Sequence, residues 1–191
     1  MTVLYRCAWL AALWVHGSTA WATIELHMPT PKGYVAYAVE GEWPVLSMQM
    51  QLPVAAAAFR IPNAADAGTS DSTNLAIVLY DLQSAEGRTA FKTPVKQYAP
   101  QVPQAQVKGP WTVYRQEASQ EGTFYTILDA KRKGVADVSV SVRMAWPHRE
   151  SNPTGYDAEI EARFWSFLQS IRGARGAYVA PDAATAAKVA P

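Results

Sequence analysis

Cysteine is almost absent from this sequence. The one cysteine, Cys7, lies within the first 22 residues, which have the composition of a removable leader. A chain without that leader has no thiol, and this excludes disulfide bonds, thiol catalysis and cysteine metal ligands. The stability of the protein must therefore come from a hydrophobic core, and the 191-residue chain is long enough to form one.

Net charge and histidine are also scarce. The sequence has 17 lysines and arginines against 16 aspartates and glutamates, so no global basic field can hold nucleic acid or an anionic membrane surface. Only His27 and His148 follow the leader, whereas zinc sites take three or four protein ligands. Nucleotide-binding glycine motifs and the G-x-S-x-G nucleophile elbow are missing as well. We expect no nucleic-acid partner and no cofactor, with calcium at one polar loop as the alternative.

Residues 1–22 have the layout of a signal peptide. Arg6 supplies a positive start, Cys7–Val15 is apolar, and Ala20–Ala22 places small residues around a tryptophan. Polar residues at 16–19 interrupt the apolar stretch, which is too short to span a membrane, and no later run is long enough. We expect cleavage after this segment and a periplasmic or secreted protein. An uncleaved anchor and a buried first helix are the alternatives.

Much of the remaining sequence alternates between apolar and polar residues with a period of two, which is typical of half-buried strands. Strands are expected at 45–52, 75–82, 111–118, 123–130 and 138–146. The second is a nearly continuous apolar run, which predicts a central strand. The last three predict consecutive antiparallel neighbours, with Lys131–Gly134 as a solvated turn.

One helix is indicated near the C-terminus. Its apolar stripe has spacings of three and four residues and consists of Tyr156, Ile160, Phe164, Phe167, Leu168 and Ile171. Thr154 and Asp157 fit a capping box at its start, and a shorter helix is expected between Ser84 and Lys92. We therefore predict one α+β domain over 23–173, a mostly antiparallel sheet packed by a long C-terminal helix and one or two minor helices.

Two segments are expected to lack regular structure. Residues 174–191 are rich in alanine with little to bury, which predicts a disordered tail. Residues 93–110 contain four prolines. Because each proline removes a backbone donor, this segment predicts a loop or an extended connector and neither a helix nor a central strand.

The most polar cluster of the sequence is the loop NAADAGTSDSTN. It offers Asn63, Asp66, Asp71 and Asn74 as oxygen ligands that calcium could use. The spacing does not match an EF-hand loop, however. We favour a turn in which these side chains hydrogen-bond to the backbone, and we keep the loop as a binding candidate because polar loops on rigid sheets often bind ligands.

Tryptophans form a second group of candidates. Trp43 and Trp111 flank prolines at expected strand edges, and Trp165 lies beside the helix stripe. Tryptophans at partly buried edges are typical anchors of protein interfaces. Core packing is the alternative role for each of them. Trp146 continues the apolar face of its strand and is expected in the core.

The quoted stretch FRIPNAADAGTSDSTNLAIVLYDL, the hairpin over 123–146 and the closing helix TGYDAEIEARFWSFLQSIR together resemble exported domains of the Mog1/PsbP/DcrB-like group. The resemblance covers most of 33–172. It implies a sheet sandwiched by helices in a group whose members bind proteins or assist assemblies and share no catalytic set.

These observations predict an exported, non-catalytic domain that binds another protein. An immunity-type inhibitor of a toxin delivered to the periplasm is one alternative. A hydrolase is the other, with a site near His148, which could use Asp157 and a serine, or with calcium near Asp66 and Asp71.

Overall fold

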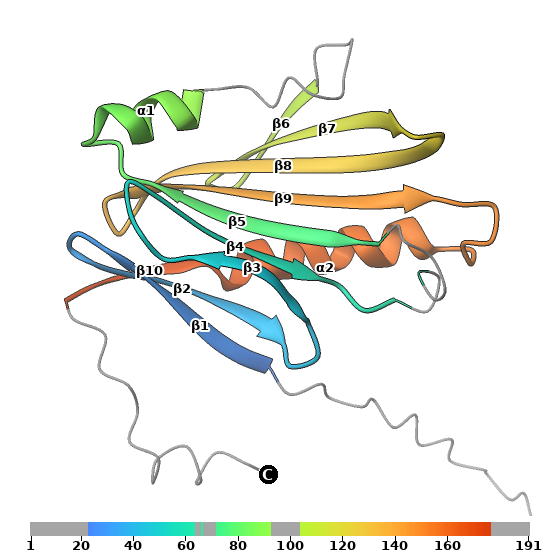
Figure 1. Ribbon diagram of the computed structural model, residues 1–191, viewed down its shortest axis with the longest axis horizontal. Coiled ribbons are helices and arrows are strands. Elements are labelled where there is room, and N and C mark those ends of the chain that lie inside the picture. Colours follow the sequence, from blue (N-terminus) through green and yellow to red (C-terminus); the bar gives the residue numbers. More distant parts are fainter. Residues whose placement is uncertain (1–22, 64–65, 67–71, 93–103, 177–191) are drawn as a thin grey trace, which may run out of the picture.

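The computed structural model describes residues 23–63, 66, 72–92 and 104–176. Within these ranges the elements, in chain order, are β1 (Thr23–Thr30), β2 (Gly33–Glu40), β3 (Val45–Gln49), β4 (Val54–Arg60), β5 (Asn74–Tyr80), α1 (Ala85–Lys92), β6 (Gln104–Lys108), β7 (Trp111–Gln120), β8 (Thr123–Val135), β9 (Val138–His148), α2 (Tyr156–Ser170) and β10 (Arg172–Arg175). Figure 1 shows their arrangement. Neither described helix is long and apolar enough to cross a membrane.

The strands form two antiparallel sheets. The larger has the order β3-β4-β5-β9-β8-β7-β6, and the smaller has the order β1-β2-β10. The predicted α+β class and the mostly antiparallel sheet are confirmed. The smaller sheet was not predicted, because its strands β2 and β10 come from nearly opposite ends of the described sequence and no local pattern links them.

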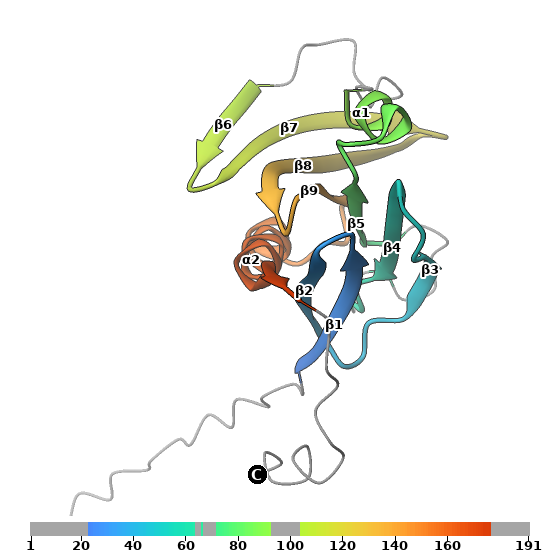
Figure 2. The ribbon, with the colours of Figure 1, turned by 90° about the vertical axis from the view of Figure 1, so that its left-hand side faces the viewer.

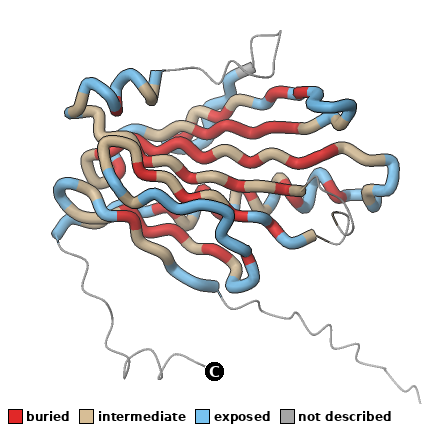
Figure 3. Tube along the Cα trace, viewed as in Figure 1, coloured by how far each residue is buried: buried red, intermediate tan, exposed pale blue. Residues whose placement is uncertain are grey.

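The larger sheet curves, and Figure 2 shows α2 and the smaller sheet within its concave side. One hydrophobic core joins side chains from all three layers, among them Val35, Tyr37, Phe59, Leu75, Ile77, Val140, Val142, Met144, Trp146, Ile160, Phe164 and Leu168. The buried stretches follow the middle of the strands (Figure 3). Each large apolar side chain buried in this way stabilises the fold by about 1.5–3 kcal/mol.

The start of α2 differs from the prediction. The helix stripe is buried as expected, but the N-cap is Gly155, whose left-handed φ of 87° suits glycine, and no side chain caps the helix. Asp157 accepts a hydrogen bond from Trp146 Nε1 at 2.8 Å. The predicted capping box is therefore wrong, because this carboxylate bonds to β9 and not to its own helix.

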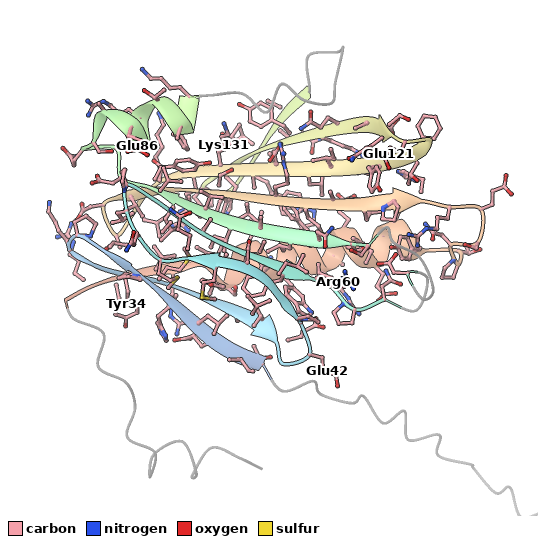
Figure 4. The ribbon with its side chains drawn as sticks, viewed as in Figure 1. Tyr34, Glu42, Arg60, Glu86, Glu121 and Lys131 are labelled. Atoms are coloured by element: carbon pink, nitrogen blue, oxygen red, sulfur yellow. The ribbon has the colours of Figure 1, made fainter. Side chains whose placement is uncertain are left out.

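The turn between β8 and β9 also lies later than predicted. β8 continues through the basic run to Val135, with an irregular register after Arg132, and the chain turns at Ala136 and Asp137. The side chain of Lys131 lies between β8 and α1 (Figure 4), and its Nζ donates to the carbonyl oxygen of Phe91 at 3.3 Å. The basic run is thus not a solvated hairpin tip.

β3 is shorter and more exposed than the strand predicted at 45–52. All five of its residues are exposed, because β3 is an edge strand. At the C-terminus, Ala174 and Arg175 belong to β10 and not to a disordered tail, and residues 177–191 lie outside the described residues. Of the proline-rich segment, 93–103 lie outside them too, whereas Gln104–Lys108 form β6, an edge strand.

Candidate functional site

The polar loop lies at one end of the larger sheet. Asp66 Oδ1 accepts from Arg149 Nη1 at 2.8 Å, and Asp66 Oδ2 accepts from the backbone N–H of Thr73 at 2.8 Å. The Thr73 hydroxyl in turn shares a hydrogen bond of 2.9 Å with the Tyr156 hydroxyl. These four residues, Asp66, Thr73, Arg149 and Tyr156, are called the polar cluster. It connects the strand β5 to the start of α2.

Burial dominates the electrostatics of the polar cluster. The side chains of Asp66 and Arg149 are only 9% and 14% exposed. Desolvation raises the pKa of Tyr156, whereas hydrogen bonds from Thr73 and Asn63 oppose that rise. The charges of this cluster therefore compensate each other inside the protein.

The other loop candidates also serve local structure. The carbonyl oxygen of Asn63 accepts from the backbone N–H of Asp66 at 3.1 Å, and Asn74 exchanges hydrogen bonds with Ser72. Asp71 lies outside the described residues. No group of three or more His, Cys, Asp or Glu side chains that could hold a metal occurs in the ranges the structure covers. Calcium binding at this loop remains a prediction.

His148 lies beside two possible catalytic partners. Its Nε2 hydrogen-bonds to the Thr126 hydroxyl, and its Nδ1 is 3.9 Å from Asp157 Oδ2. This order resembles a hydroxyl–histidine–carboxylate triad, although its hydroxyl belongs to a threonine, whereas the alternative taken from the sequence placed a serine beside His148 and Asp157. Thr126, however, is completely buried. Because a nucleophile must touch its substrate, the arrangement favours a structural link between β8, β9 and α2.

The three candidate tryptophans separate into two places. Trp43 is buried, its ring stacks on Phe167 at 6.1 Å, and its Nε1 donates to Glu40 at 3.3 Å. Trp43 therefore takes the core-packing alternative. Trp111 and Trp165, which are 54 positions apart in the sequence, both line one groove. Trp111 is only 5% exposed and belongs to the hydrophobic core as well, whereas Trp165 is half-buried.

The groove lies between the β6–β7 turn and the second half of α2, and its volume is about 330 Å³. Its lining consists of Lys108, Gly109, Pro110, Trp111, Arg132, Trp165, Leu168, Gln169 and Ile171. Gly109 allows the tight turn because its φ of 58° is in the left-handed region. The register then places Lys108 opposite Trp111 on the side of the sheet that faces α2.

Each tryptophan of the groove has a cation against its ring. Lys108 Nζ is 3.9 Å from the centre of the Trp165 ring, and Arg132 Cζ is 5.8 Å from that of Trp111. Such contacts stabilise by about 0.5–1 kcal/mol at exposed positions. Buried Leu168 and Ile171 supply the apolar floor. The groove thus combines flat apolar surface with positive charge.

Sequence reasoning found the tryptophans but missed the cations. Lys108 was assigned to a proline-rich connector and Arg132 to a solvated turn. The available signal was the Lys-Gly-Pro-Trp order at 108–111, which predicts a tight turn that brings lysine and tryptophan face to face. The approach of Trp165 from α2 depends on tertiary packing and leaves no local signal.

A comparison of the sequence with models of known protein families finds no match, and no curated protein matches it either.

Proposed function

We propose that this chain is an exported, non-catalytic domain that binds another protein through the groove at Trp111 and Trp165. The observation that carries the proposal is the pairing of two tryptophan rings with two cations around an open, partly apolar groove. Tryptophan and arginine are the side chains that most often dominate protein interfaces. In this proposal α2 packs the sheet and holds Trp165 in place.

The N-terminal segment supports export. The first residue after the expected cleavage point, Thr23, is also the first residue of β1. Removal of 1–22 would therefore leave every described strand intact. N-terminal sequencing of protein from the periplasm or the medium should give Thr23 as the first residue, and a chain that keeps Met1 in the cytosol would contradict export.

The binding role is tested by photo-crosslinking from within the groove. A photoreactive amino acid replaces Gln169, which lines the groove and is exposed. The matched control carries the same amino acid at Ser166, which is exposed on α2 outside the groove lining. We expect a crosslink to another exported protein from position 169 only, and its loss in a chain that also carries Trp165→Ala.

Equal crosslinking from positions 169 and 166, or a crosslink that persists with Trp165→Ala, would overturn the proposal. Circular dichroism of each variant must first show an unchanged melting temperature. This check ensures that a lost crosslink reports on the groove and not on a loss of folding.

A further inference from the structure

The cations of the groove differ from other cations nearby in one respect. Among the residues that the structure describes, no carboxylate pairs with Lys108 or Arg132. Glu161, one turn before Trp165 on α2, pairs with Arg115 at 2.9 Å and accepts a hydrogen bond from Trp165 Nε1 at 3.3 Å, but it is not among the residues that line the groove. The lining therefore contains two positive charges and no negative one.

β6 provides a second, independent feature beside the groove. Among the described residues it is an edge strand that pairs with β7 alone, so no described strand pairs with the backbone donors and acceptors of its outer side. Its side chain Val107 is 79% exposed. Edges of this kind accept an additional strand from a partner, with affinity from the backbone and specificity from alternate side chains.

We infer that the groove binds an acidic segment of the partner protein, which adds to β6 in an extended conformation. The inference rests on the proposed function of the groove. In an added strand, the residue beside Lys108 has its side chain on the face that Lys108 and Trp111 share. A carboxylate there lies within reach of the two unpaired cations, and apolar neighbours contact Trp165.

The opposite edge of the same sheet gives an internal comparison. β3 presents Val45, Leu46 and Met48, all exposed, and contains no charged residue. A peptide that adds to β3 therefore meets no cation on that strand itself. Binding that depends on negative charge reports on β6 and the groove, whereas binding without that dependence reports on β3 or on another apolar surface.

The experiment titrates the purified full-length chain with two capped heptapeptides. One alternates glutamate and valine, and its matched control replaces each glutamate by glutamine. We expect the acidic peptide to bind at least about tenfold more tightly at low salt, since charge-assisted hydrogen bonds are the stronger kind. Added salt should remove most of that difference, because the groove is open to solvent.

Variants locate the binding. Lys108→Gln with Arg132→Gln should weaken the acidic peptide to the level of the glutamine peptide. Lys133 is an exposed cation on β8 outside the groove lining. Lys133→Gln removes a positive charge there and should change the affinity for the acidic peptide less than about twofold. Equal binding of the two peptides, no binding of either, or an equal effect of Lys133→Gln would overturn the inference.

Failure here is distinguishable from failure of the proposed function. If the crosslink from position 169 depends on Trp165 but acidic peptides show no preference, the groove binds a protein and the assignment of an acidic segment is wrong. If no crosslink depends on Trp165, the binding role itself is wrong.

Discussion

The polar cluster and the groove both contain cationic side chains, but those side chains have different surroundings. In the polar cluster, the guanidinium of Arg149 pairs with Asp66 in a largely buried setting. In the groove, Lys108 and Arg132 lie over tryptophan rings, and neither pairs with a carboxylate among the residues that the structure describes. A cation that is neutralised inside the protein holds the fold together, whereas a cation left without a carboxylate can attract a ligand. The difference separates a structural site from a binding site although both contain charged and aromatic residues.

The largest expected effect tests the structural side of this comparison. Arg149→Met leaves the Asp66 carboxylate buried without the opposite charge of Arg149, although the Thr73 N–H still donates to it, and we expect the free energy of unfolding to fall by about 3–5 kcal/mol. Urea denaturation measures it. The control is Arg115→Met, which breaks the more exposed ion pair with Glu161 and should cost less than about 1 kcal/mol. Equal losses in the two variants would show that the polar cluster does not hold the fold.

Tyr37 differs from both regions, because its hydroxyl is a buried polar group without a hydrogen-bond partner among the described residues. Burial raises the pKa of this hydroxyl to about 12 from the ordinary value of 10. Because the folded state disfavours the tyrosinate, the contribution of Tyr37 to stability should be constant below about pH 9 and fall by roughly 2 kcal/mol between pH 10 and 12. Urea melts across this range measure the decline.

Tyr37→Phe supplies the control for the alkaline decline. The variant should lose much of that pH dependence and remain at least as stable as the parent at neutral pH, since it removes a buried hydroxyl that has no partner. An unchanged decline in the variant would assign it to other groups.

Tyr156→Phe should have an intermediate effect. It removes the hydroxyl that bonds to Thr73, whose own hydroxyl is completely buried. We expect a loss of about 1–2 kcal/mol at neutral pH, because a buried group is left without its partner. Comparison with Tyr37→Phe by urea denaturation isolates the value of the hydrogen bond. A loss no larger than that of Tyr37→Phe would show that the Thr73 bond contributes little.

The smallest effects on stability are expected in the groove. Lys108→Gln and Arg132→Gln each remove one contact between a cation and a ring, and each should cost less than about 1 kcal/mol in a thermal or urea melt. The same substitutions should weaken the binding of the acidic peptide strongly. A large loss of stability would instead make these cations structural, as in the polar cluster.

The sequence predicted the parts of the fold that repeat a local pattern. The alternation in β9 and the stripe of α2 identify buried side chains such as Val142 and Phe164, and both are completely buried. β3 failed this rule, because Leu46 and Met48 alternate like core residues but lie on an edge strand and are both nearly half exposed. Local pattern does not reveal which strand ends a sheet.

The candidate sites show the same contrast between what residue type and local pattern predict and what only the tertiary arrangement decides. Trp111 and Trp165 could be singled out by residue type, but their meeting depends on the position of α2 against the β6–β7 turn. The sequence did not single out Arg149, because its ion pair with Asp66 spans 83 positions. The β8–β9 turn was misplaced because Gly134 is a typical turn residue, whereas the chain turns at Ala136 and Asp137.

The most direct test of the central claim is an NMR titration that follows the indole N–H signals of the tryptophans as the acidic peptide is added. The account predicts that the signals of Trp111 and Trp165 move with the peptide concentration. Those of Trp43 and Trp146, which are buried and do not line the groove, should stay in place. Movement of Trp146, which bonds to Asp157 near the polar cluster, with Trp111 and Trp165 unchanged would contradict the claim that the groove is the binding site.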